Sequence, residues 1–77
     1  MTYEEKMVRY VASKLIQRKF LMQKGYFPPE NVLARLINQV CKQLKDEYRD
    51  LKFVRNQSED GLITPIVKSA VDKLKIL

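Results

Sequence analysis

The sequence predicts a mainly α fold: a small three-helix bundle in which a long antiparallel helical hairpin is closed by a short C-terminal helix. Three observations lead to this prediction. Apolar residues recur at the three-and-four spacing of a helix face along most of the chain. Only two glycines and three prolines occur among the 77 residues, too few for a turn-rich β fold. A chain of this length has room for one hydrophobic core, so residues 1–77 are expected to form a single helical domain.

The most regular segment runs from Val32 to Leu51, and it is expected to be the central helix. Its polar residues occupy one side of a helical wheel, and its apolar residues share the other. The apolar members are Leu33, Leu36, Ile37, Val40, Leu44, Tyr48 and Leu51. A helix of about 20 residues is roughly 30 Å long, which is close to the width of a small domain. The rest of the chain must therefore cover this apolar stripe.

The first helix is expected to begin near Tyr3 and to end at Gly25. Thr2 and Glu5 form a capping box, in which each side chain satisfies a backbone N–H of the other residue. Gly25 can adopt the left-handed conformation that ends many helices. The connection over residues 26–29 is short, which makes the first two helices antiparallel neighbours. Its two aromatic residues are expected to tuck into the core.

The apolar pattern of the first helix is imperfect. Most of its apolar residues share one broad face: Tyr3, Met7, Val8, Val11, Leu15, Leu21 and Met22. Ile16 and Phe20 fall outside this face, and Arg18 lies within it. We expect a partner chain to cover Ile16 and Phe20, which with Tyr10 are the predicted partner-binding residues. Two alternatives stay open: the helix bends near residues 17–19, or the displaced side chains cover the C-terminal helix.

After the central helix, the pattern changes to a polar loop that ends in Asp60 and Gly61. Residues 51–54 and 62–64 are compatible with β structure and flank this loop, so the sequence leaves open a two-stranded ribbon there. The third helix is then expected to open with Thr64 as its cap and Pro65 in its first turn. The apolar stripe that should close the core comprises Ile66, Val67, Ala70, Val71, Leu74 and Leu77.

The residue types argue against an enzyme. The chain has no histidine, which is the commonest general base near neutral pH and the commonest metal ligand. Its single cysteine, Cys41, is expected to pack as a small hydrophobic residue. Residues 61–70 resemble a segment of the catalytic core of the dihydrolipoamide acyltransferases, but the chemistry of that family depends on a histidine. We therefore predict no cofactor, no metal ion and no small-molecule substrate.

Location and assembly follow from the same composition. One cysteine cannot form an intramolecular disulfide, and the first residues lack the apolar segment of a secretory signal, so the cytoplasm is the expected compartment. No run approaches the roughly 18 apolar residues of a membrane span, so no membrane insertion is expected. A core this small often gains stability from a partner subunit, and we expect a homodimer or docking to another protein.

Charge supplies a second functional hypothesis. Fifteen Lys and Arg against nine Asp and Glu give a net charge of +6, and the excess is concentrated in the first helix and the tail. Such a field attracts polyanions such as nucleic acid, although many small proteins are equally basic without a polyanionic partner. The residues expected to contact phosphates or base edges are Arg9, Arg18, Lys24, Arg35, Asn38, Gln39, Lys42, Arg49 and Arg55.

The polar-faced central helix followed by an Asp-Gly turn resembles winged-helix repressors, in which the loop from Arg55 to Gly61 would be the wing. The central helix lacks the turn that would divide it into two, and Asp46 and Asp50 on its polar face would repel phosphate. The leading hypothesis is therefore a small non-enzymatic interaction module, which contacts a partner through apolar surface on the first helix. The alternative is a basic nucleic-acid-binding protein, either a winged-helix-like variant or a transcription regulator.

Overall fold

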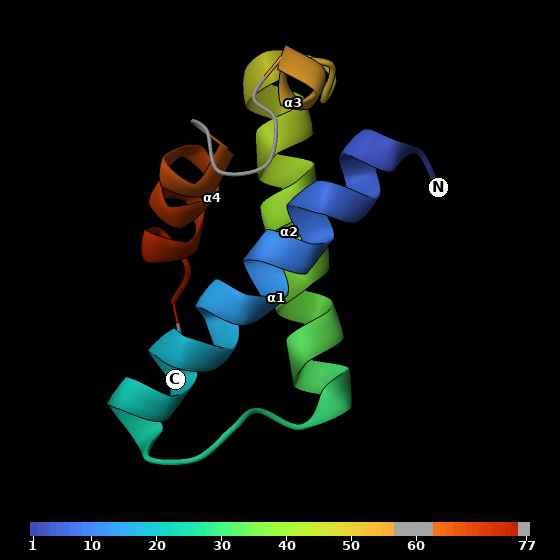
Figure 1. Cartoon of the computed structure of the whole chain (residues 1–77). Coiled ribbons are helices and arrows are strands. Elements are labelled where there is room, and N and C mark those ends of the chain that lie inside the picture. The colour runs from blue at the N-terminus through green and yellow to red at the C-terminus, as the bar shows by residue number, and fades with distance from the viewer. Residues whose placement is uncertain (57–62, 76–77) are drawn as a thin grey trace.

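The computed structural model describes residues 1–56 and 63–75, and every regular element within them is a helix. In chain order these are α1 (Tyr3–Lys24), α2 (Glu30–Tyr48), α3 (Phe53–Asn56) and α4 (Ile63–Asp72). Figure 1 shows that α1 crosses α2 obliquely, that α2 runs back in the opposite sense, and that the short α3 sits at the far end of α2. α4 packs against both α1 and α2. The predicted three-helix bundle with an antiparallel hairpin is confirmed.

α1 begins and ends where the sequence predicts. The backbone N–H of Glu5 donates a hydrogen bond of 3.1 Å to the Oγ1 of Thr2, which is the N-cap. At the other end, Gly25 has a left-handed φ of 82°, and its N–H donates to the carbonyl oxygen of Leu21 at 2.9 Å. The Glu5 carboxylate, which a capping box would direct back to Thr2, instead pairs with Lys45 of α2.

The core is one cluster to which all four helices contribute. Each fully buried Val, Leu, Ile or Phe side chain stabilises the fold by about 1.5–3 kcal/mol relative to its exposed state. α1 supplies a stripe that repeats every four residues, and α2 and α4 supply the two facing stripes. The buried apolar residues are Val8, Ala12, Ile16, Phe20, Leu36, Ile37, Val40, Cys41, Leu44, Leu51, Val54, Ile63, Val67, Ala70 and Val71.

This cluster corrects the prediction for α1, because Ile16 is fully buried and Phe20 is only 6% exposed within the single chain. They belong to the same i, i+4 stripe as Val8 and Ala12. A four-residue repeat drifts slowly around a helix with 3.6 residues per turn, so the buried stripe follows the oblique crossing rather than a straight face. α1 is uninterrupted from its first to its last residue. Ile16 and Phe20 therefore belong to the core of this chain and need no second subunit to cover them.

α2 ends at Tyr48 rather than at Leu51. Arg49 has a φ of 66° and a ψ of −33°, a conformation that L-residues rarely adopt, and it stops the helix. The predicted two-stranded ribbon is wrong in the part of the chain that the structure describes. Residues 53–56 form α3, which buries Val54 and places the Phe53 ring 4.7 Å from that of Tyr48. Most of the polar loop lies outside the described residues.

α4 begins at Ile63, so Thr64 is its second residue and not its cap. Pro65 does lie in the first turn, where its missing N–H costs no hydrogen bond. Of the predicted stripe, Val67, Ala70 and Val71 are buried, Ile66 and Leu74 are partly buried, and Leu77 lies outside the described residues. No helix in residues 1–56 and 63–75 combines the length and apolar content that a membrane span requires.

Candidate interaction surfaces

Only one of the three predicted partner-binding residues lies on the surface. Tyr10 is 57% exposed, whereas Ile16 and Phe20 are core residues. The homodimer prediction rested on Ile16 and Phe20 being left uncovered by their own chain. That reason no longer holds, and the oligomeric state stays a prediction.

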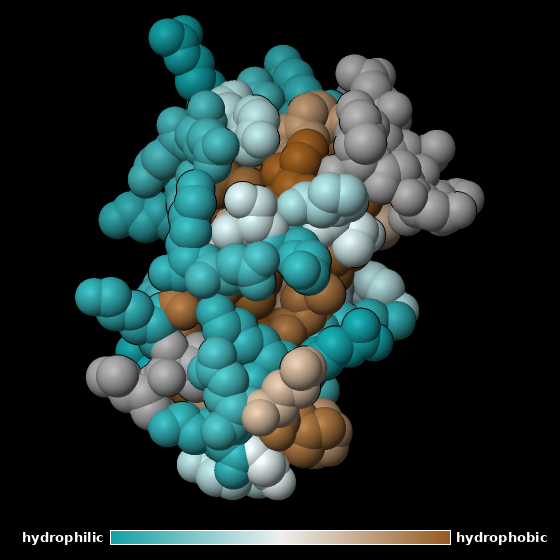
Figure 2. Space-filling model, turned by 90° about the vertical axis from the view of Figure 1, so that its left-hand side faces the viewer, coloured by the Kyte–Doolittle hydropathy of each residue, from teal (hydrophilic) through white to brown (hydrophobic). Residues whose placement is uncertain are grey.

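A different group of apolar residues is exposed, at the last turn of α1 and in the connection to α2. Leu21, Met22, Tyr26 and Phe27 are 41%, 80%, 56% and 61% exposed, respectively. We call these four residues the apolar end. It lies at the lower end of the molecule in the orientation of Figure 1, and apolar atoms are also visible at the lower end of Figure 2. The Tyr26 ring packs edge-on against Phe20 of the core, with ring centroids 5.5 Å apart, so this end has a fixed base.

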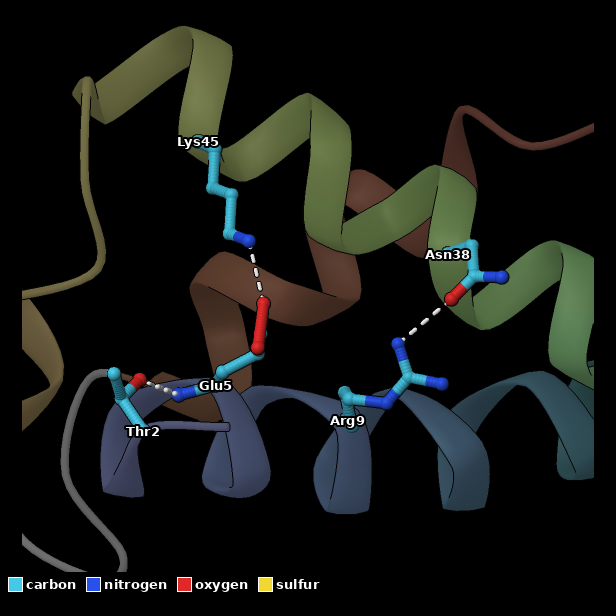
Figure 3. A network of polar contacts seen from close by, with 5 residues as sticks. All are labelled: Thr2, Glu5, Arg9, Asn38 and Lys45. Carbon is cyan, nitrogen blue, oxygen red and sulfur yellow. Dashed lines mark hydrogen bonds and ion pairs between the residues drawn. The ribbon is translucent and has the colours of Figure 1, made fainter.

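Two polar contacts join α1 to α2 at the surface (Figure 3). Lys45 Nζ lies 2.5 Å from a carboxylate oxygen of Glu5, and Arg9 Nη1 donates a 2.7 Å hydrogen bond to Asn38 Oδ1. The hydrogen bond from Lys45 lowers the pKa of Glu5 below its ordinary value, and the same bond raises the pKa of Lys45. Both contacts span the helix pair and favour one alignment of α1 on α2.

Lys19 binds the C-terminal end of α4. Its Nζ donates to the backbone carbonyl oxygens of Val71, Asp72 and Leu74 at 3.0, 3.3 and 3.1 Å. A helix leaves its last carbonyls unpaired, and the negative end of its dipole favours a cation. Lys19 is one of the cations that make α1 basic. In the structure it caps α4, whose C-terminal end lies more than 50 residues further along the chain.

Four of the predicted nucleic-acid contacts meet on the outer face of α2. Arg35, Asn38, Gln39 and Lys42 line one shallow depression, in which every lining residue is basic or uncharged. Arg9 borders the same surface through its hydrogen bond to Asn38. We call this surface the basic face of α2.

The other predicted contacts are dispersed. Arg18 lines a groove between α1 and α4, and Lys24 is exposed in the last turn of α1. Arg49 lies beyond α2 beside Asp50, and the side chain of Arg55 lies outside the described part of the chain, as does nearly all of the predicted wing. α2 is one undivided helix, unlike the helix pair of a winged-helix protein.

Two observations on the described residues concern metal-ligating and nucleophilic side chains. Within residues 1–56 and 63–75, no three His, Cys, Asp or Glu side chains gather where they could hold a metal ion. Cys41 is buried, and this burial raises the pKa of its thiol despite the nearby Arg9 guanidinium. At neutral pH, Cys41 is therefore mainly in the thiol form, which is less nucleophilic than the thiolate.

Comparisons of the chain with protein-family models, with curated proteins and with solved structures gave no match. Function must therefore be inferred from the surfaces of this chain. The apolar end and the basic face of α2 are the two candidates.

Proposed function

We propose that this protein is a small non-enzymatic interaction module that docks another protein chain through the apolar end. The exposure of four large apolar side chains around Gly25 is the observation that supports this proposal. Large apolar side chains that gather in one patch on a protein surface often mark a contact site. Tyr, Phe and Met are also the residue types enriched in the cores of protein interfaces.

The local structure around the apolar end favours binding. Gly25 fixes the turn that follows α1, and the edge-on contact with Phe20 fixes the Tyr26 ring. Side chains that are already ordered lose less conformational entropy when a partner binds. Met22 differs from these aromatic residues, because its flexible thioether can adapt to the shape of a partner.

Site-specific photo-crosslinking tests this proposal. A photoreactive phenylalanine analogue is placed at Phe27 and at Met22, with exposed Lys52, at the opposite end of α2, as the matched control position. In cells that express the protein, the two positions of the apolar end should give discrete cross-linked products that Lys52 does not give. Phe27→Asp should abolish the product formed at position 22 while leaving the circular dichroism spectrum unchanged. Equal products at all three positions, or none at any of them, would contradict the proposal.

The basic face of α2 supports nucleic-acid binding as a second candidate function. Arg35 and Lys42 lie about 10 Å apart along the helix axis, with Asn38 and Gln39 between them. Cations of this kind contact phosphates, and amide side chains can read base edges. The bond from Arg9 occupies Asn38 Oδ1, so Asn38 would offer its amide hydrogens to an acceptor on a base.

Fluorescence anisotropy with labelled duplex and single-stranded oligonucleotides tests this second candidate across a salt series. Affinity should fall steeply with salt, because bound cations displace counterions from the phosphates. Arg35→Ala and Lys42→Ala should weaken binding to all sequences alike, whereas Lys52→Ala should have little effect. Gln39→Ala should alter sequence preference if α2 enters a groove. The absence of binding at about 50 mM salt would eliminate this function.

A further inference from the structure

A groove of about 320 Å³ runs between the C-terminal half of α1 and α4. Its apolar lining comes from Leu15 and Met22 of α1 and from Val71 of α4. Figure 2 faces this side of the molecule and shows an apolar strip between hydrophilic side chains. The groove belongs to the surface of one chain, and it lies beside the apolar end, since Met22 is part of both.

Positive charge borders the groove on both sides. Arg18 and Lys19 come from α1, and Lys68 comes from α4, against one carboxylate, that of Asp72. Lys68 Nζ lies 3.8 Å from Asp72 Oδ2, and both side chains are exposed. An exposed ion pair of this kind contributes little to stability, so Lys68 can pair with a carboxylate of a partner instead. The ammonium group of Lys19 is directed at the α4 carbonyl oxygens, so Arg18 and Lys68 are the cations that an occupant can reach. Two exposed cations on opposite sides of the groove, against one carboxylate, favour an occupant with negative charge along its flanks.

The groove is elongated in the direction of α1. Leu15 and Met22 are seven residues apart, which places them about 10 Å apart along the helix axis. A partner helix presents apolar side chains at the same i, i+3, i+4, i+7 spacing when it docks into a groove between helices. The apolar end then extends the contact beyond the last turn of α1.

We propose that this groove docks an amphipathic helix of another protein, with apolar residues on the face that enters the groove and acidic residues on both flanks. The inference rests on the proposed interaction function and adds the chemistry of the partner. A second copy of this chain is a poor occupant, because it carries a net charge of +6 and would bring further cations to the same surface.

Two synthetic peptides of about 18 residues, long enough for five helical turns, test the charge preference. Both carry leucine at the positions that enter the groove. One has glutamate on its flanks, and the other has lysine at the same positions. In fluorescence anisotropy titrations at about 100 mM salt, the acidic peptide should bind at least about tenfold more tightly than the basic peptide. In amide NMR spectra, the shifts that it causes should concentrate on α1 from Leu15 to Met22 and on α4 near Val71.

Charge reversal supplies the matched control. Arg18→Glu combined with Lys68→Glu should lower affinity for the acidic peptide by at least about tenfold and should improve binding of the basic peptide. Lys42→Glu combined with Lys52→Glu makes the same change in net charge away from the groove. The control should lower affinity by less than about threefold, because neither lysine lines the groove and salt screens exposed charges that do not contact the peptide.

The outcomes separate this inference from the function on which it rests. Equal losses in the two double variants, indifference to peptide charge, or no binding of either peptide would overturn the groove proposal. The interaction function would still stand if cross-linking at Met22 and Phe27 gave discrete products. Cross-linking could also identify a partner that has no acidic amphipathic helix. Such a partner would overturn the groove proposal but would support the interaction function.

Discussion

Lys19→Met removes the ammonium group that holds the end of α4 against α1, and it keeps most of the apolar stem. The Nζ atom lies 3.0 to 3.3 Å from three backbone carbonyl oxygens. A hydrogen bond from a charged donor contributes about 1.5–3 kcal/mol, and a cation at a partly buried helix terminus up to about 2 kcal/mol. These two values describe the same contacts and do not add. Because Lys19 is only half-buried, we expect a loss of about 1.5–2 kcal/mol.

Urea denaturation followed by circular dichroism at 222 nm measures this loss, and the melting temperature should fall by about 6–16 °C for a chain of this size. Hydrogen exchange should accelerate at the amides of Lys73 and Leu74, which donate to carbonyls in the last turn of α4. Lys6→Met is the matched control, since Lys6 is exposed on the same helix, and it should change stability by less than about 0.5 kcal/mol. Equal losses in the two variants would refute the capping role of Lys19.

Three further predictions follow from burial, backbone strain and charge. Leu44→Ala should destabilise the fold by about 2–5 kcal/mol, because Leu44 is 1% exposed and its truncation leaves a cavity, whereas surface Lys42→Ala should cost no more than about 0.5 kcal/mol in the same urea titration. Arg49→Gly should raise the free energy of unfolding by about 0.5–1 kcal/mol, since glycine adopts the φ of 66° without strain, and a measured decrease would contradict this account. The Glu5–Lys45 pair should make stability depend on pH, because folding lowers the pKa of Glu5 and raises that of Lys45. The contribution of Glu5 is present above its unfolded pKa and is lost as pH falls through the folded value, and that of Lys45 is lost only as pH rises through its folded value. Glu5→Gln should therefore flatten the acid limb of a stability profile, and an unchanged limb would show that the pair contributes nothing.

The parts of the fold that could be predicted are those decided by nearby residues. Thr2 caps the start of α1 and Gly25 caps its end, and both are predictable because a cap involves only the backbone groups within one turn. The α2 stripe around Val40 and Leu44 was equally predictable, because its two faces scarcely mix in sequence. Arg49 shows the limit of such signals, because no glycine marks the end of α2 and a basic residue adopts the positive φ instead.

Which face of α1 is buried depends on how α2 and α4 pack against it, so the sequence of α1 alone does not determine that face. The sequence places Ile16 and Phe20 outside the apolar face because their link to Val8 in the buried stripe is Ala12, whose small side chain adds little to the apolar pattern. The contact of Lys19 with Val71 joins residues 52 positions apart, and no local pattern predicts a partner at that distance.

The apolar end illustrates the same limit for the candidate site. Hydrophobicity alone assigned Leu21 and Met22 to the buried face, but α1 has 22 residues and α4 only 10, so one helix cannot cover the whole length of the other. The exposed length of α1 is thus a consequence of the chain's topology. A short α4 capped by Lys19 leaves both the groove and the apolar end uncovered. The capping contact of Lys19 and the groove proposed for binding therefore both lie at the C-terminal end of α4. Lys19 lines the groove and is also expected to stabilise the fold, so its replacement would affect both roles at once. Arg18 and Lys68 border the groove with exposed side chains, so their replacement tests binding with little expected change in stability.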